Sequence, residues 1–182
     1  MAGPKRGIDL CGNILIEYDM RIKTCEKENH DLQLIDGASI IRFKDMQNCH
    51  VFTNRIHGDT GAIDITTACL EDAVEATIEV ILSEVQRGFN LCLCCFPSGL
   101  KEEIGIFDGA VSEPCHLARS VVAVVIGSWV SLKFKLGSES SGSVERQCSF
   151  KANNHGFSAQ NLKTDFALIS AKVPWSAMPQ GH

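Results

Sequence analysis

The chain has 182 residues, of which 45% are hydrophobic and 21% are charged, and its formal net charge is −5. This composition excludes an intrinsically disordered protein and fits one domain with a sizeable core. The negative balance gives no electrostatic reason to bind a phosphate backbone or an anionic lipid surface. We therefore expect a single domain over 1–182, with neither nucleic acid nor a membrane as its partner.

The first element along the chain is a strand over 14–23. Apolar side chains occupy every even position of this segment, and from position 17 onward every odd position is charged. A strand with one buried face and one wet face produces this period of two. The charged positions, which indicate a solvated face rather than a catalytic carboxylate pair, are Glu17, Asp19, Arg21 and Lys23.

Alternating or β-branched segments recur along the rest of the chain. We expect a break at Asp36-Gly37 in the second of them, and irregular connections over 42–61 and 152–160. The run over 120–126 is typical of a strand covered on both sides. The predicted strands cover 14–23, 32–41, 62–69, 89–95, 103–107, 120–126, 130–136, 144–150 and 165–173. About nine strands with short turns indicate an all-β, antiparallel β-sandwich.

The segment over 70–86 fits two structures. As a helix it has an apolar stripe, acidic residues near its N-terminal end and Gly88 where a C-cap would lie. As a strand it has apolar residues at alternate positions from Val74 to Leu82. The pattern alone leaves one short helix or one strand open.

Nine cysteines are the unusual feature of the composition. An odd number cannot all pair within one molecule, and their spacing matches no small secreted framework. No glycosylation sequon occurs, and no apolar run approaches the length of a bilayer span. We expect no secretory leader, and reduced thiols in a cytoplasmic or nuclear protein. The cysteines are Cys11, Cys25, Cys49, Cys69, Cys92, Cys94, Cys95, Cys115 and Cys148.

Five segments resemble, in this order, a plant domain of unknown function that is abundant in grasses. They are GPKRGIDLCGNILIEYDMRIK, DLQLIDGAS, AVEATIEV, EEIGIFDG and ARSVVAVV. That domain also forms the C-terminal part of the sixty-kilodalton jasmonate-induced proteins, where it follows a ribosome-inactivating domain. The resemblance runs from Gly3 to about Val173. It implies an all-β fold, which favours a strand over 73–85.

Members of that family carry further residues, including early strands, before the Gly-Pro-x-Arg-Gly motif. In this sequence only Met1-Ala2 precede the motif. We therefore expect a chain truncated at its N-terminal side, with an incomplete sheet. An unprotected sheet edge would allow self-association.

The resemblance raises two activities that the residues do not support. Ribosome-inactivating folds hold adenine between two tyrosines and use a Glu and an Arg one helical turn apart. This chain has only one tyrosine, Tyr18, and Glu75-Ala76 is followed by no arginine at that spacing. Cap-binding factors stack a methylated guanine between two tryptophans. Trp129 and Trp175 fit no such motif, and we expect them to close the ends of the sandwich.

Three short motifs invite a chemical interpretation. In Cys92-Leu93-Cys94-Cys95 a strand would turn Cys92 and Cys94 to one face and Cys95 to the other, so three thiolates would not converge on a metal. Catalytic Cys–His pairs meet in space rather than as neighbours such as Cys115-His116. His57-Gly58-Asp59 fits a turn as well as a cation or proton-transfer site.

The resemblance, together with the lack of a converging catalytic set, implies a non-enzymatic plant protein-interaction or regulatory module, tied to stress or defence responses. We expect no catalytic residue, no metal ligand and no cofactor. The partner would be another protein. The alternatives are a nucleotide- or cap-binding module of the translation machinery, and an accessory domain of a ribosome-inactivating rRNA N-glycosylase.

Overall fold

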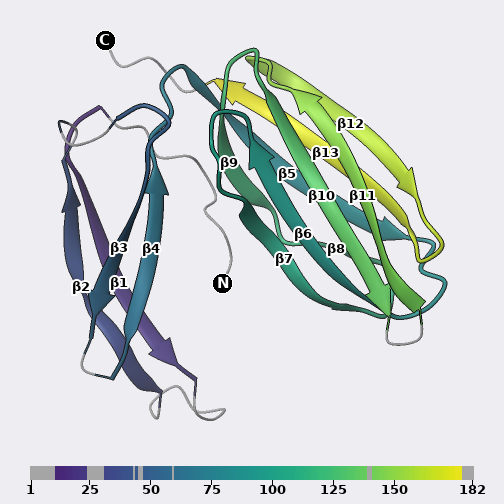
Figure 1. Cartoon of the computed structure of the whole chain (residues 1–182), viewed down its shortest axis with the longest axis horizontal. Coiled ribbons are helices and arrows are strands. Elements are labelled where there is room, and N and C mark those ends of the chain that lie inside the picture. The colour runs from purple at the N-terminus through teal and green to yellow at the C-terminus, as the bar shows by residue number, and fades with distance from the viewer. Residues whose placement is uncertain are drawn as a thin grey trace. The chain divides into compact units, whose positions relative to one another are not determined.

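The computed structural model describes residues 11–23, 31–42, 44, 47–58, 60–138 and 141–177. Every regular element in these residues is a β-strand (Figure 1). None of the described segments is a helix of the length and apolarity that crossing a bilayer requires. The strands are β1 (Ile14–Ile22), β2 (Leu32–Ile41), β3 (Val51–His57), β4 (Ala62–Ala68), β5 (Ala73–Ser83), β6 (Phe89–Pro97), β7 (Ile104–Val111), β8 (Cys115–His116), β9 (Ser120–Val125), β10 (Trp129–Ser138), β11 (Ser141–Lys151), β12 (His155–Lys163) and β13 (Leu168–Ala177).

The predicted fold class, all-β with antiparallel sheets, is confirmed. Contacts divide the chain into two compact units, one over Asp9–Cys69 and one that includes Leu70–His182. Such a division does not test whether the two units fold separately. The single domain over 1–182 therefore stays a prediction.

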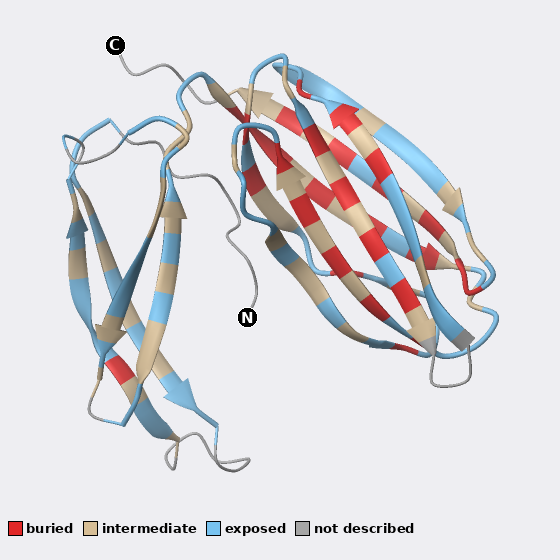
Figure 2. Cartoon of the chain, viewed as in Figure 1, coloured by how far each residue is buried: buried red, intermediate tan, exposed pale blue. Residues whose placement is uncertain are grey.

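The larger unit is a β-sandwich. One sheet has the strand order β11-β10-β6-β7, and the other has the order β12-β13-β5-β8, with β9 also paired to β5. Buried bands alternate mostly with half-buried bands along the central strands (Figure 2). On β10 the predicted alternation is confirmed, because Val130, Leu132, Phe134 and Leu136 are fully buried between the sheets. Each such side chain stabilises the fold by roughly 1.5–3 kcal/mol.

Strand β5 resolves the open choice over 70–86. Its side chains at every second position from Val74 to Leu82 are buried, and β5 pairs with β13 along one edge and with β8 and β9 along the other. The short helix near 70–86 is therefore wrong. Backbone hydrogen bonds on both edges and burial of one face outweigh a helical spacing that only some of these residues satisfy.

Three further sequence-based expectations are also wrong. β3 lies within 42–61 and β12 overlaps 152–160, where we expected irregular connections. Most side chains of β12 are exposed, so hydrogen bonds to β13 rather than a buried face make it a strand. β2 is continuous through Asp36-Gly37, because Gly37 lies opposite Tyr18 on β1 and keeps the register.

The run over 120–126 does form a strand, but it is covered on one side only. Val122 and Val124 of β9 are buried, whereas Ala123 between them is exposed. Pairing with the central strand β5 keeps β9 extended. The prediction that both faces of this strand are covered, which came from its uninterrupted apolar run, is therefore wrong.

The smaller unit consists of two hairpins, β1–β2 and β3–β4. On β1 the predicted alternation is confirmed, with half-buried residues at even positions from Ile14 to Met20 and exposed residues at odd ones. Among the described residues of this unit only Ile35 is a buried hydrophobic side chain. Most of the apolar surface of the unit therefore stays partly accessible.

Candidate functional site

The β1–β2 hairpin presents an outer face with a distinctive mixture of side chains. Leu15 lies directly opposite Ile40, and these two side chains are 60% and 63% exposed. Farther along the same face Glu17 lies opposite Ala38, and Asp19 lies opposite an acidic residue of β2, Asp36. An exposed apolar pair next to three carboxylates is the combination that polar-rimmed protein-binding surfaces show.

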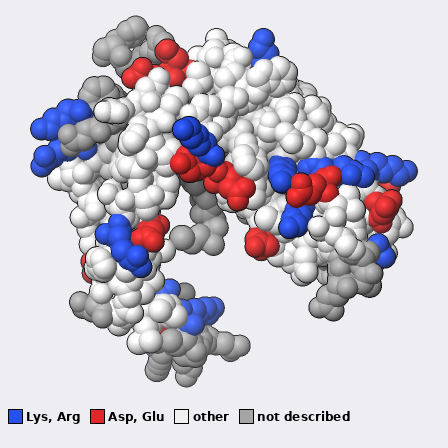
Figure 3. Space-filling model, in the orientation of Figure 1, with Lys and Arg blue, Asp and Glu red and all other residues white. Residues whose placement is uncertain are grey.

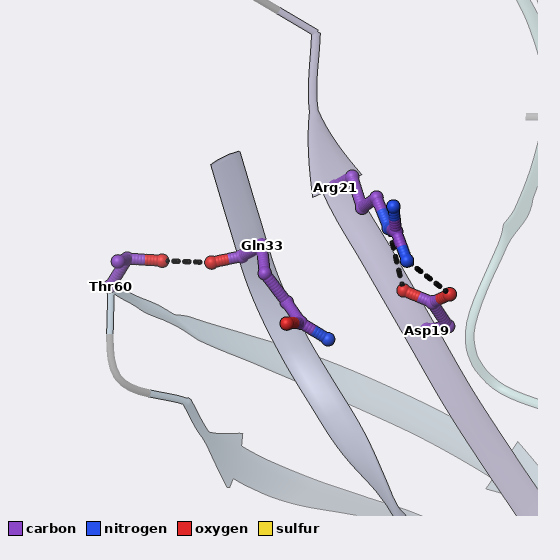
Figure 4. A network of polar contacts seen from close by, with 4 residues as sticks. All are labelled: Asp19, Arg21, Gln33 and Thr60. Atoms are coloured by element: carbon purple, nitrogen blue, oxygen red, sulfur yellow. Dashed lines mark hydrogen bonds and ion pairs between the residues drawn. The ribbon is translucent and has the colours of Figure 1, made fainter. Parts of the chain in front are cut away.

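Arg21 organises the charged end of this face. Its guanidinium donates to both carboxylate oxygens of Asp19, from Nε at 3.1 Å and from Nη2 at 3.2 Å (Figure 4). The hydrogen bond to Asp19 is the main cause that raises the pKa of Arg21. The outer face carries three carboxylates and two cations, and so has one net negative charge: Glu17, Asp19 and Asp36 against Arg21 and Lys23. The interpretation of 14–23 as having a solvated charged face is confirmed, since Glu17, Asp19 and Arg21 are all exposed.

The turn between β3 and β4 holds β2 in place. Thr60 Oγ1 donates a hydrogen bond of 2.5 Å to the backbone oxygen of Gln33, which lies beside a β-bulge between β1 and β2 (Figure 4). Gly58 packs so closely against the backbone oxygen of Leu34 that any Cβ at this position would collide with it. Close approach of the backbone, rather than a special φ angle, therefore requires glycine here.

The sandwich carries a second group of ionisable side chains on the outer face of the β11-β10-β6-β7 sheet. Cys92 Sγ and Cys94 Sγ are 3.9 Å apart on β6. Burial and the neighbouring thiol Cys92 raise the pKa of Cys94 to about 11. Lys133, the register partner of Cys94, forms an ion pair of 3.0 Å with Glu145 on β11. On the face of the molecule drawn in Figure 3, basic and acidic side chains are interspersed in this way.

A family model described as a domain of unknown function, DUF6598, matches residues 1–173. The chain belongs to the DUF6598 family. No curated protein and no solved structure matches the chain. The resemblance to a domain of unknown function over nearly the whole sequence is thereby confirmed.

Within this DUF6598 chain the residues that suggested glycosylase chemistry belong to different units. Tyr18 is half-buried on the inner face of β1. Glu75 is buried on the central strand β5 of the sandwich, and the residues that follow it continue the strand. The helical turn on which a Glu and an Arg would meet is therefore not formed at Glu75.

The two tryptophans of the DUF6598 chain lie in different sheets and different environments. Trp129 begins β10 and is 50% exposed. Trp175 is buried in the core from β13, and its indole Nε1 donates to Ser158 Oγ at 3.2 Å. The structure does not bring them together as the two stacking faces of a base-binding site, because one ring is part of the core.

The three short motifs are now placed. Cys92 and Cys94 lie on the outer face of β6 and Cys95 is buried on the inner face, as predicted. Cys115-His116 forms the two-residue strand β8, in which the thiol packs against the core and the imidazole is exposed. His57-Gly58-Asp59 lies at the β3–β4 turn, although Asp59 falls outside the described residues.

Sequence reasoning missed two features of this DUF6598 chain. It identified no surface role for Leu15 and Ile40, because β2 was expected to be broken and the cross-strand pairing was therefore unknown. It also placed Cys92 and Cys94 on one face without predicting sulfur–sulfur contact. The spacing C-x-C within an alternating strand is the signal that both thiols share a face.

Proposed function

We propose that the chain is a non-enzymatic protein-interaction or regulatory module of plants, active in stress or defence responses, and that the outer face of the β1–β2 hairpin binds its partner. The observation that carries the proposal is the exposed cross-strand pair Leu15–Ile40 beside Glu17, Asp19 and Asp36. The resemblance to a domain of the jasmonate-induced proteins supports the plant and stress setting.

The surface defines the chemistry of the partner. A binding segment would place an apolar side chain over Leu15 and Ile40 and a basic side chain near the three carboxylates. Among the described residues β1 has a hydrogen-bonded neighbour on only one edge, which is β2. An extended partner segment can add to such an edge through backbone hydrogen bonds, and pockets or charges on the face then give specificity.

A paired-variant binding experiment tests this function. The double variant Leu15→Thr/Ile40→Thr removes most of the apolar area and keeps residues that favour strands. Its matched control, Ile126→Thr, alters an exposed apolar residue of the sandwich that is 46% exposed. Immobilised wild-type chain, the double variant and the control are each incubated with plant extract, and captured proteins are identified by mass spectrometry and measured again as purified components.

We expect a reproducible protein partner that the wild type and Ile126→Thr retain and that Leu15→Thr/Ile40→Thr loses. Since the carboxylates contribute, its association should weaken as salt rises. A partner that binds all three proteins equally would place the interaction elsewhere. Depurination of ribosomes by the isolated chain would overturn the non-enzymatic assignment.

A further inference from the structure

Cys92 and Cys94 form a pair of thiols that faces solvent from a rigid strand. Their sulfurs are 3.9 Å apart, and both side chains are half-buried. Cys92 also lines an open depression of about 460 Å³ together with Asp108 and Lys135. β6 is an inner strand of its sheet, with β10 and β7 on its two sides, so the backbone that holds the pair is fixed along both edges.

A disulfide does not suit this pair. Side chains two apart in a strand point the same way, so their Cβ atoms are separated by about two residue rises of 3.3 Å, which is about 6.6 Å. A disulfide requires Cβ atoms only about 3.5–4.5 Å apart. Closing the bond would therefore distort a strand that is hydrogen-bonded on both edges. The two thiols can approach each other but cannot join without disrupting the sheet.

A metal ion can occupy the gap that a disulfide cannot close. An ion about 2.3 Å from each sulfur, the usual zinc–sulfur distance, spans any separation up to about 4.6 Å, which includes the observed 3.9 Å. Soft thiolate ligands select Cu(I), zinc and iron–sulfur clusters. The pair therefore has the geometry of a two-sulfur chelate.

The number of ligands discriminates between these metals. In the part of the chain that the structure describes, no group of three His, Cys, Asp or Glu side chains converges on one point. Zinc in structural sites needs four ligands, and iron–sulfur clusters are held by four cysteines. Cu(I) is satisfied by two thiolates in a near-linear arrangement, which the two sulfurs reach when side-chain rotation widens their separation from 3.9 Å. It is therefore the soft ion that this pair fits best.

The neighbouring strand supplies compensating charge. Two thiolates around Cu(I) carry one net negative charge. Lys133 and Lys135 on β10 are the register partners of Cys94 and Cys92. Their ammonium groups lie on the same face of the sheet as the sulfurs, where Lys133 is also paired with Glu145 and Asp108 of β7 lies opposite Cys92. Burial raises the pKa of Cys94, so the metal ion must displace a thiol proton on binding.

We propose that Cys92 and Cys94 bind one Cu(I) ion on the outer face of β6. The site is independent of the hairpin surface of the smaller unit and goes beyond the proposed interaction function. Binding replaces the two thiol protons with the metal ion, and no electron is transferred when copper is supplied as Cu(I).

The test is competition for Cu(I) between the full chain and the chromophoric chelator bathocuproine disulfonate, under anaerobic conditions. Three proteins are compared: the wild type, Cys92→Ser/Cys94→Ser, and the matched control Cys49→Ser/Cys69→Ser, which removes two thiols of the smaller unit. Loss of an outer-shell partner alone weakens metal binding roughly 10–100-fold, so loss of both ligands should weaken it by more. We expect the wild type and the control to retain one equivalent of Cu(I) at a chelator excess that strips the Cys92/Cys94 variant.

A second measurement does not depend on the folding of any variant. Cu(I)-loaded and copper-free wild type are alkylated briefly, and the modified cysteines are located by mass spectrometry. Protection of Cys92 and Cys94 by Cu(I) supports the site. Equal alkylation of both thiols with and without Cu(I), equal retention of copper by the Cys92/Cys94 variant, or loss of the tight equivalent in the control overturns it.

Discussion

Asp19 lies directly opposite Asp36 in the register of the β1–β2 hairpin. Carboxylates at such positions repel each other, and cross-strand pairs of like charge destabilise a sheet. Arg21 offsets part of this repulsion, since its guanidinium binds both oxygens of Asp19 at 3.1 and 3.2 Å. The hairpin therefore maintains a negatively charged surface at some cost to its own stability.

Neutralising one member of this pair should stabilise the hairpin. We expect Asp36→Asn to raise the free energy of unfolding by roughly 0.2–1 kcal/mol, because it removes the cross-strand repulsion. The gain should shrink as salt rises. Urea denaturation at low and high salt measures both effects.

Asp64→Asn is the control for this charge change. Asp64 lies opposite Arg55 in the β3–β4 hairpin, with an ion pair of 3.7 Å. Removal of its charge should leave stability unchanged or lower it slightly. An equal stabilisation by both variants would point to net charge rather than to the Asp19–Asp36 pair.

Gly58→Ala should destabilise the smaller unit. The added Cβ would collide with the backbone oxygen of Leu34, and forced overpacking typically costs about 1–3 kcal/mol. Gly37→Ala is the matched control, because open space surrounds that position on β2. There alanine should be neutral or stabilise by up to about 1 kcal/mol, since glycine weakens a strand interior. Hydrogen exchange of the β2 amides distinguishes the two, and equal protection in both variants would contradict the packing argument.

Cys95 should make the sandwich sensitive to alkali. Burial raises the pKa of Cys95 from 9.0 to about 12. As the pH rises the unfolded chain therefore loses this proton first, so the stabilisation is complete below pH 9 and is lost as the pH passes from 9 to 12. One such thiol contributes a slope of up to about 1.4 kcal/mol per pH unit.

The measurement for Cys95 is the pH dependence of the free energy of unfolding, not its absolute value. Cys95→Ala should lose stability less steeply between pH 9 and pH 11 than the wild type. Val130→Ala removes two buried methyl groups from the inner face of β10 but no titratable group, so it should lower the stability and keep the wild-type slope. A slope for Cys95→Ala equal to that of the wild type would contradict the role of this thiol.

The predictability of each strand followed the burial of its face. β1 and β10 alternate between apolar and polar residues because one face of each packs inward, so their sequences alone predicted strands. β12 is an edge strand with mostly exposed side chains. Its extended structure depends on hydrogen bonds to its neighbour β13. Backbone pairing of this kind requires no apolar pattern in the sequence of β12 itself.

The surface features depended on information that one strand does not contain. The pairing of Leu15 with Ile40 requires the register across the β1–β2 hairpin, and the register includes a bulge near Met20. The contact between the Cys92 and Cys94 sulfurs depends on side-chain rotamers, which spacing does not determine. The common face of the two thiols, by contrast, follows from their positions in one strand.

Among the described residues of the smaller unit, Ile35 alone is a buried hydrophobic side chain. This affects how the protein tolerates mutation. Substitutions at exposed positions usually change stability by less than about 0.5 kcal/mol, so the two hairpins can acquire new side chains with little loss of folding energy. The sandwich, with its dense interior, cannot change as freely. Side-chain changes that alter the surface should therefore cost less stability in the hairpins than in the sandwich.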